Sequence, residues 1–253
     1  MNPVVVLAGD GASSRILVNA LQERFPLERV IIEDAESRVL FLKRRIKRMG
    51  VLPVADQVLF QLYGRIAGRG ARRRIEEIKA QYGMDDAPPP EALVTRVPSA
   101  NADETIELLR SLQPKVVVVN GTRILSRRLL ESVPAIFLNT HAGITPGYRG
   151  VHGGYWALAQ GEPDRCGVTV HVVDPGIDTG EVVTQAMISP TPRDSFWTYP
   201  YLQLAAGLPL MMQAVEDALA GRLGRKKGEG PSRLWSHPGL TGYLSRRLLK
   251  QIR

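Results

Sequence analysis

The sequence has one cysteine, Cys166, and therefore no partner for an internal disulfide. A single thiol is usual in a reducing compartment, so the cytoplasm is the expected location. No uninterrupted apolar run approaches the about 20 residues that a membrane-spanning helix needs. Residues 1–8 lack the basic segment and the long apolar core of a secretory signal. These absences argue against a disulfide-stapled secreted scaffold and against a membrane-spanning protein.

Histidine and aromatic residues are scarce as well. The 253 residues include four histidines, and aromatic residues make up 6% of the chain. The histidines, the acids and Cys166 do not show the spacing of metal ligands, so no metal is expected. Hydrophobic residues make up 44% and charged residues 23%, which is ordinary for a globular domain that buries a full core.

Acidic residues are outnumbered, 25 against 33 Lys and Arg, which gives a formal net charge of +8. The excess lies in four clusters, at residues 38–48, 65–74, 225–227 and 246–253. Such clusters attract nucleic acid, anionic lipid or phosphorylated substrates, or they are simply solvated helix faces. Little aromatic interleaving and no nucleic-acid-binding motif accompany them, so a nucleic-acid partner is not favoured. Peripheral contact of the basic helices with a membrane and a homodimer contact both stay open.

Short apolar runs separated by turn residues indicate alternating strands and helices. Residues 4–8 and 30–32 have the pattern of buried parallel strands on either side of a helix, which is a βαβ opening. Residues 37–90 then carry apolar positions at three- and four-residue spacing, which predicts a mostly helical insertion. Three consecutive prolines at 88–90 close the insertion as a stiff connector.

Strand and helix patterns resume after the insertion. We expect strands at 93–95, 116–119 and 135–138, helices at 102–112, 126–133, 154–159 and 201–220, and a hairpin-like pair at 168–173 and 181–188. The predicted organisation is an α/β domain over residues 1–223, followed by a basic C-terminal tail over 224–253 with a helix at 243–252.

A glycine-rich turn follows the first strand. Its residues are Gly9, Asp10, Gly11, Ala12 and Ser13. Because the turn opens a helix, its backbone N–H groups could hold a phosphate or a carboxylate, although a plain tight turn fits equally well. Ser14 stands where the dinucleotide-binding fingerprint has its third glycine, and the Lys of a P-loop is absent. A nucleotide-dependent oxidoreductase is therefore disfavoured.

Polar side chains follow two of the predicted strands. Asn139 and His141 are two residues apart on an extended segment, so their side chains point to the same side. An amide and an imidazole that converge on one point can stabilise an oxyanion and move a proton. Asp178, on a loop flanked by glycines, could orient the imidazole. Each residue alone has an ordinary structural explanation, but the three together favour a catalytic site.

Several motifs in fixed order surround these residues. They are Val117–Ser126, Leu138–His141, Pro146–Gly150, Gly167–His171 and Asp178–Gln185. The sequence resembles the folate-dependent formyltransferase family, which includes the glycinamide ribonucleotide, methionyl-tRNA and sugar N-formyltransferases. The likeness covers about residues 93–223 and, more weakly, 1–33. It implies a Rossmann-like fold with a mostly parallel central sheet, N10-formyltetrahydrofolate as the one-carbon donor, and an amine as the acceptor, which for this chain we expect to be a small molecule.

The resemblance also implies roles for individual residues. The family's catalytic residues fall on Asn139, His141 and Asp178. Its folate site falls on Arg123, Ile124, Leu125, Val173, Asp174, Pro175, Gly176 and Ile177. The Gly9–Ser13 turn occupies the place that holds the acceptor's phosphate in the ribonucleotide enzyme. His152, next to Gly153 and Gly154, is expected from its position to be a further acid/base group or acceptor contact. The implied reaction is direct attack by a neutral amine, with the oxyanion held by Asn139 and a charged His141.

The sequence departs from the family pattern near the predicted site. The loop Ala142–Thr145 lacks a proline and a serine that usually follow the catalytic His, and the tail does not resemble a barrel domain. The second departure argues against a tRNA acceptor. We expect a phosphorylated or nucleotide-linked acceptor, with an amino sugar preferred over glycinamide ribonucleotide. A formyltetrahydrofolate hydrolase and a catalytically spent membrane- or nucleic-acid-binding adaptor are the alternatives.

Overall fold

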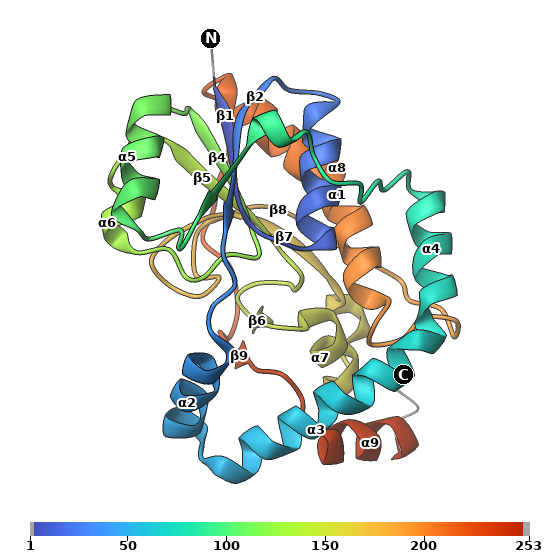
Figure 1. Cartoon of the computed structure of the whole chain (residues 1–253). Coiled ribbons are helices and arrows are strands. Elements are labelled where there is room, and N and C mark those ends of the chain that lie inside the picture. Colours follow the sequence, from blue (N-terminus) through green and yellow to red (C-terminus); the bar gives the residue numbers. More distant parts are fainter. Residues whose placement is uncertain (1–2, 250–253) are drawn as a thin grey trace.

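A seven-stranded sheet forms the centre of the computed structural model, which describes residues 3–249 (Figure 1). The strands are β1 Val4–Gly9, β2 Leu27–Glu33, β3 Val94–Val97, β4 Val116–Asn120, β5 Ile136–His141, β7 Gly167–Val172 and β8 Val182–Met187. Their order is β3-β2-β1-β4-β5-β7-β8. The pairs from β3 to β5 are all parallel, and β7 runs antiparallel to both β5 and β8. The prediction of a mostly parallel sheet with a hairpin-like pair is confirmed.

Helices cover both faces of this sheet, as Figure 1 shows. Helices α1 (Ala12–Gln22) and α8 (Tyr199–Leu219) lie on one face, and α5 (Asp103–Leu112) and α6 (Arg127–Leu130) lie on the other. Central parallel strands are buried on both faces, which explains why β1 and β4 are nearly continuous runs of apolar residues. The helix predicted at 126–133 is a single turn, capped by the Ser126 hydroxyl, which accepts a hydrogen bond from Leu129 N–H.

The predicted insertion is helical and extends beyond the carboxyl end of the parallel strands. It consists of α2 Arg38–Met49, α3 Val51–Ala67, the 3-10 turn η1 Gly68–Ala71 and α4 Arg72–Gln81. Figure 1 shows α2 and α3 on the far side of the strand ends from the sheet, while α4 returns alongside α8. A second 3-10 turn, η2 Glu91–Leu93, leads the chain back into β3.

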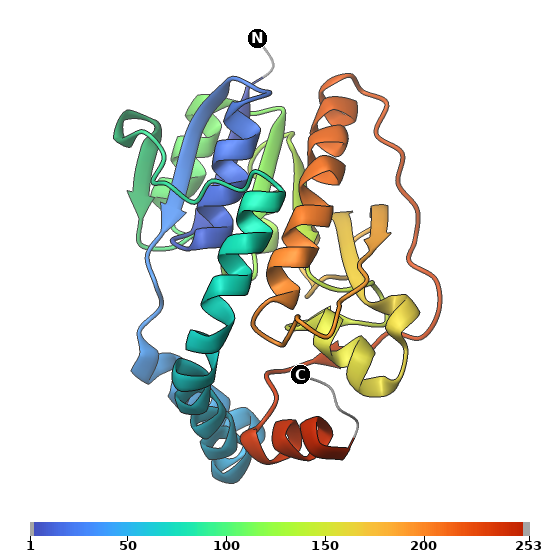
Figure 2. The ribbon, with the colours of Figure 1, turned by 90° about the vertical axis from the view of Figure 1, so that its right-hand side faces the viewer.

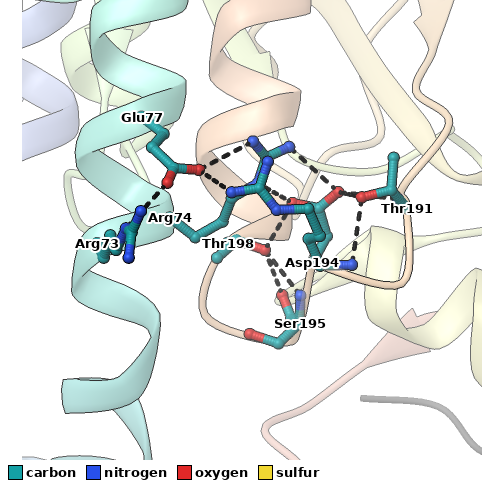
Figure 3. Close-up of polar contacts among 8 residues, drawn as sticks. Arg73, Arg74, Glu77, Thr191, Asp194, Ser195 and Thr198 are labelled. Carbon is teal, nitrogen blue, oxygen red and sulfur yellow. Dashed lines mark hydrogen bonds and ion pairs between the residues drawn. The ribbon is translucent and has the colours of Figure 1, made fainter.

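Contacts from α3 and from α4 fix the insertion to the rest of the chain. On α3, the buried ring of Phe60 packs against Phe196 and Tyr243, with ring centroids 5.0 Å apart in both cases. On α4, Arg74 Nε donates a hydrogen bond of 2.8 Å to Asp194, in the loop that precedes α8 (Figure 3). The insertion is therefore joined to the body through α3 and α4.

The C-terminal segment folds back along the molecule. After α8 the chain runs down the side of the body to the far end (Figure 2), where β9 (Leu234–Trp235) pairs with β6 (Arg149–Gly150). The Trp235 ring stacks on Tyr148 and Trp156. Helix α9 (Leu240–Leu249) begins three residues before the predicted start, and the end of the predicted helix, 250–252, lies outside the described residues. The division at residue 223 stays a prediction.

The remaining elements are α7 (Gly153–Gln160) and the 3-10 turn η3 (Pro163–Arg165). Between residues 3 and 249, no helix combines the length and the apolar character that would let it cross a membrane.

Candidate active site

Strands β5 and β7 place an amide and an imidazole side by side. They are antiparallel neighbours, and their register pairs Asn139 directly with His171. The Asn139 Nδ2 donates a hydrogen bond of 3.1 Å to His171 Nε2, and His171 Nδ1 donates one of 2.9 Å to the Val172 carbonyl. Because a carbonyl can only accept, His171 carries its hydrogen on Nδ1. Asn139 Nδ2 retains a second N–H, which is free to bind another acceptor.

His141, at the end of β5, is held between a carbonyl and a carboxylate. Its Nε2 donates to the Tyr148 carbonyl over 2.6 Å, and its Nδ1 lies 3.3 Å from Asp178 Oδ2. The side chain is only 6% exposed. A hydrogen bond from both ring nitrogens at once requires the charged imidazolium. The arrangement therefore offers a place for one additional proton on His141.

The carboxylate of Asp178 lies at the centre of these groups. Its Oδ2 accepts a hydrogen bond of 2.8 Å from Gly150 N–H, and its Oδ1 lies 3.7 Å from His171 Nε2. The residue has a left-handed backbone with φ of +50°, which Asp tolerates better than most residues. The adjacent carbonyl of Ile177 accepts a hydrogen bond of 3.0 Å from Arg149. The loop is therefore anchored on both sides of the carboxylate.

The surroundings favour an ionised Asp178 and a neutral His141. Burial raises the pKa of Asp178, but the neighbouring rings of His171 and His141 and the hydrogen bond from the Gly150 amide together bring this pKa below its usual value. Burial lowers the pKa of His141 and outweighs the opposing effects of Asp178 and the Tyr148 carbonyl. The charged form of His141 therefore has to be created by a proton taken up during the reaction.

The loop that follows His141 explains one departure from the family pattern. A side chain in place of the Gly143 hydrogen would collide with the Tyr148 carbonyl and with the His141 ring. The small residue thus permits the close contact between His141 and Tyr148. The loop is held further by Thr169, whose hydroxyl donates to the Gly143 carbonyl over 2.7 Å and accepts from Thr145 N–H over 3.1 Å.

Sequence reasoning missed three groups in this site, namely His171, the Tyr148 carbonyl and the Gly150 amide. His171 lies within a predicted strand, and a signal for it was present because it is one of only four histidines. Its position opposite Asn139 depends on the antiparallel register of two strands that are about 30 residues apart in sequence. The two backbone groups have no side-chain signal at all.

The residues predicted to bind folate lie in two places. Arg123 contacts the buried Glu33 and donates hydrogen bonds to the carbonyls of Pro98 and Asp34. Leu125 is buried in the core, while the Ile124 side chain is exposed. The structure thus leaves Ile124 as the outward side chain of this segment.

The second folate segment, residues 173–177, borders a cleft. Val173 N–H donates to the Phe137 carbonyl over 2.8 Å, and Asp174 accepts hydrogen bonds from Gly176 N–H and the Thr179 hydroxyl. Pro175 lies between them. The adjoining cleft has a volume of about 410 Å³. It is lined by Thr145, Pro146, Arg149, Val172, Asp174, Asp178, Thr179, Gly180, Glu181, Lys227, Gly228 and Ser232.

This volume is within the range of pockets that hold small molecules, about 300–1,000 Å³. Asp178 brings the catalytic cluster to the wall of the cleft, and Asp174 brings the predicted folate loop there. Three further lining residues, Lys227, Gly228 and Ser232, belong to the C-terminal segment. The described residues contain no group of three or more His, Cys, Asp or Glu that could hold a metal ion.

The glycine-rich turn lies at the carboxyl end of β1, next to β4. Asn120 Nδ2 donates to the hydroxyls of Ser13 and Ser14 over 3.2 and 2.9 Å. Asp10 forms an exposed ion pair of 3.0 Å with Arg96. A side chain at Gly9 would meet the Gly121 carbonyl at 2.5 Å, so close packing of two strand ends requires this glycine. Gly11 caps the helix and Ala12 begins it.

His152 does not join the cluster around Asp178. Its Nε2 lies 2.9 Å from His237 Nδ1, and its ring packs against Phe196. Burial first and the neighbouring His237 second lower the pKa of His152 to about 3. Burial first and Arg45 second lower the pKa of His237 to about 4. The two rings form a partly buried, neutral pair that links the start of α7 to the C-terminal segment.

This pair predicts a loss of stability in mild acid. The unfolded chain takes up protons on both histidines below a pH of about 6.5, but the folded chain does not. Stability is therefore complete above about pH 6.5 and falls as the pH approaches the folded values of about 4 and 3. At about pH 5 we expect a loss of about 2 kcal/mol per histidine relative to about pH 7.5.

Urea unfolding at both pH values measures this effect. The double variant His152→Gln/His237→Gln should show a weaker dependence on pH than the native chain, even if it is less stable throughout. An unchanged dependence would show that these two groups do not control the acid response.

Comparison with known proteins agrees with the fold. A family model described as formyl transferase matches residues 70–203, just over half of the chain. A methionyl-tRNA formyltransferase from Desulfotalea psychrophila is 31% identical over 122 residues, which is 48% of this chain and 38% of that protein. The chain spans about half or less of the length of the curated relatives it matches.

Solved structures share the fold along nearly the whole chain. A phosphoribosylglycinamide formyltransferase from Streptococcus pneumoniae aligns with a TM-score of 0.55 and 22% identity, over 85% of this chain and 98% of that one. An N-formyltransferase from Helicobacter canadensis, in complex with folinic acid and dTDP-3-aminofucose, aligns with a TM-score of 0.54 and 14% identity, over 92% and 70%. The predicted Rossmann-like formyltransferase fold is confirmed. The chain belongs to the formyl transferase family.

Proposed function

We propose that this chain transfers a formyl group from N10-formyltetrahydrofolate to an amine of a small acceptor, with Asn139, His141 and Asp178 as its catalytic residues. The observation that carries the proposal is the contact of 3.3 Å between His141 and Asp178, beside an Asn139 amide that has a free N–H. Membership of the formyl transferase family supports it. A cytoplasmic location, favoured by the single cysteine, is part of the same proposal.

The residues of the chain have distinct tasks in this reaction. N10-formyltetrahydrofolate supplies an activated formyl carbon when it is bound. The free N–H of Asn139 donates a hydrogen bond to the formyl oxygen, where negative charge develops. His141 takes up the proton that the acceptor nitrogen loses as it bonds to the formyl carbon, and returns a proton to N10 as the bond to N10 breaks.

Asp178 acts through His141. Its carboxylate lies on the ring nitrogen that gains the second proton, so it stabilises the imidazolium when that form appears. The Tyr148 carbonyl and the Gly150 amide fix the two side chains in this orientation. The 410 Å³ cleft and the loop 173–177 are the part of the molecule where we place the folate.

For the acceptor we propose a phosphorylated or nucleotide-linked amine, with an amino sugar preferred over glycinamide ribonucleotide. Arg149 and Lys227 line the cleft beside Asp174, Asp178 and Glu181, and these two cations are the groups there that suit an anionic part of the substrate. The structural neighbours include an N-formyltransferase in complex with dTDP-3-aminofucose as well as a phosphoribosylglycinamide formyltransferase. The curated relatives are methionyl-tRNA formyltransferases, so tRNA belongs among the acceptors to be tested.

The test is the formation of tetrahydrofolate, followed by absorbance, with a panel of amines. The panel includes nucleotide-linked amino sugars, glycinamide ribonucleotide and charged initiator tRNA. Amine-dependent turnover that disappears in His141→Ala supports a formyltransferase and identifies its acceptor class. Release of formate without any amine would identify a hydrolase instead. Turnover that persists in both His141→Ala and Asn139→Ala would remove the catalytic assignment.

A further inference from the structure

One face of helix α3 is apolar and lies in solvent. Seven residues at three- and four-residue spacing make up this face, and we call them the outer face of α3: Val51, Leu52, Ala55, Val58, Leu59, Leu62 and Ile66. All seven are exposed, with Leu52 at 83% and Ile66 at 71%. Residues at this spacing cover an arc of about 120° on a helix of 3.6 residues per turn. A continuous apolar stripe of this kind on a protein surface marks an interaction site.

The opposite face of α3 already holds the helix to the body. Val54, Gln57 and Phe60 are buried there, and Gln57 Nε2 donates to the His237 carbonyl over 2.7 Å. Asp56 accepts hydrogen bonds from the backbone and the side chain of Thr241, at the start of α9. The residues that pack α3 against the body are therefore a different set from those of the outer face.

Helix α2, next to α3, is cationic and is not buried. Six of its twelve residues are Lys or Arg, and the sequence has no acidic residue between Glu36 and Asp56. Among its side chains that the structure describes none is buried, and the apolar Val39, Phe41 and Leu42 are exposed. A helix with a narrow apolar stripe and a polar surface rich in Lys and Arg is typical of helices that lie in a membrane interface.

The two helices form one fixed platform. Helices α2 and α3 are in contact, and α4 is locked to the body by the ion pair between Arg74 and Asp194 (Figure 3). Figure 1 shows the platform beyond the carboxyl ends of the parallel strands, the end of the sheet at which β5 delivers Asn139 and His141. A surface bound to this platform would thus lie on the active-site side of the molecule.

We propose that the outer face of α3 and the cations of α2 together form a docking surface for an anionic lipid membrane. The apolar side chains would enter the membrane interface, and the Lys and Arg side chains would contact the lipid phosphates. A membrane therefore suits both the apolar and the cationic part of this docking surface. A second copy of the chain suits it less well. A twofold contact through the outer face would cover its apolar side chains but would offer the α2 cations no anionic partner. Nucleic acid would leave the apolar face without a partner.

The experiment is co-sedimentation of the full chain with lipid vesicles. Vesicles of phosphatidylcholine alone are compared with vesicles of equal parts phosphatidylcholine and phosphatidylglycerol. We expect partitioning to be about tenfold or more stronger on the anionic vesicles and to weaken in high salt. Residual binding at high salt is expected from the apolar face.

Variants separate the platform from the overall positive charge. Leu59→Glu/Leu62→Glu places two carboxylates in the outer face, at exposed positions where the fold does not depend on the leucines. Gln61→Glu is the matched control, because Gln61 is exposed on the same helix but outside the outer face. The double variant should lose binding by about tenfold or more, and the control should bind nearly as the native chain does.

Two binding results would overturn the proposal. One is equal binding to both vesicle types, and the other is binding that survives Leu59→Glu/Leu62→Glu. A native dimer in light scattering that the double variant converts to a monomer would overturn it too, since the face would then be a contact between copies. Because the readout is binding without turnover, the result is independent of the proposed formyl transfer.

Discussion

Asn139→Ala is expected to lower kcat by about 10²–10³, which is the usual effect of removing one preorganised oxyanion donor. The amide is fixed in place by its bond to His171 Nε2, so its second N–H costs no reorganisation during the reaction. Because this hydrogen bond strengthens only as charge develops, KM should change much less than kcat. Steady-state kinetics with the acceptor found in the amine panel gives both values.

Asn19→Ala is a suitable control for this variant. Like Asn139, Asn19 has a side-chain amide that is held by hydrogen bonds, here to the carbonyls of Asp85 and Ala87. It lies on α1, away from the cleft. It should retain native kcat. If the two variants behave alike, the amide of Asn139 has a structural role and the catalytic assignment fails.

His141→Ala and Asp178→Asn test whether the pair acts as a unit. The two side chains share one proton position, so each substitution alone should remove most of what both remove together. The double variant is therefore expected to be little slower than the slower single variant. Fully additive losses would show that Asp178 does not act through His141.

The pattern of the sequence predicted most of the α/β core but not the lengths of all its elements. Strands β1 and β4 are apolar on both faces and were recognisable for that reason. The segment at 126–133 has helical spacing but forms a single turn, with Ser126 as its cap. Helix α9 begins before the apolar pattern does, where Thr241 bonds to Asp56 on α3.

Two features of the site depend on contacts that spacing cannot reveal. His171 reaches Asn139 only through the pairing of β5 with β7. The wall of the cleft formed by Lys227, Gly228 and Ser232 depends on the path of the C-terminal segment, which sequence reasoning treated as a separate tail. The contact of His152 with His237, from that same segment, could not be read from spacing either, and the predicted contact of His152 with the acceptor stays a prediction.

The helical insertion shows a different limit of prediction from sequence. Helical periodicity predicted its helices, but α3 is apolar on both its inner and its outer side. The spacing of apolar residues shows on which side of its helix an apolar stripe lies. It does not show which of two stripes packs against the body of the protein. Only the aromatic contacts of Phe60 with Phe196 and Tyr243 decide that question.

Asp194→Ala is expected to destabilise the fold by about 3–5 kcal/mol, the usual cost of removing one partner of a buried ion pair. The carboxylate is 2% exposed and accepts hydrogen bonds from Arg74 Nε and from the backbone and hydroxyl of Thr191, each of 2.8 Å (Figure 3). Without it, the mostly buried guanidinium of Arg74 keeps only Glu77, 3.6 Å away, as a partner of opposite charge among residues 3–249. The midpoint of urea unfolding measures the loss.

Arg73→Ala on the same helix is the control for this prediction. Its side chain is 92% exposed and forms an ion pair with Glu77 one turn away on the same helix, so its removal should cost less than about 1 kcal/mol. The native pair also predicts the direction of a pH effect. Burial raises the pKa of Asp194, but Arg74 and Thr191 lower it by more, so this pKa lies below its usual value. The stabilisation is therefore present near neutral pH and is lost as the carboxylate becomes protonated in acid. Equal losses in Asp194→Ala and Arg73→Ala would contradict the assignment of this ion pair as the anchor of α4, because only the first substitution removes a buried charge.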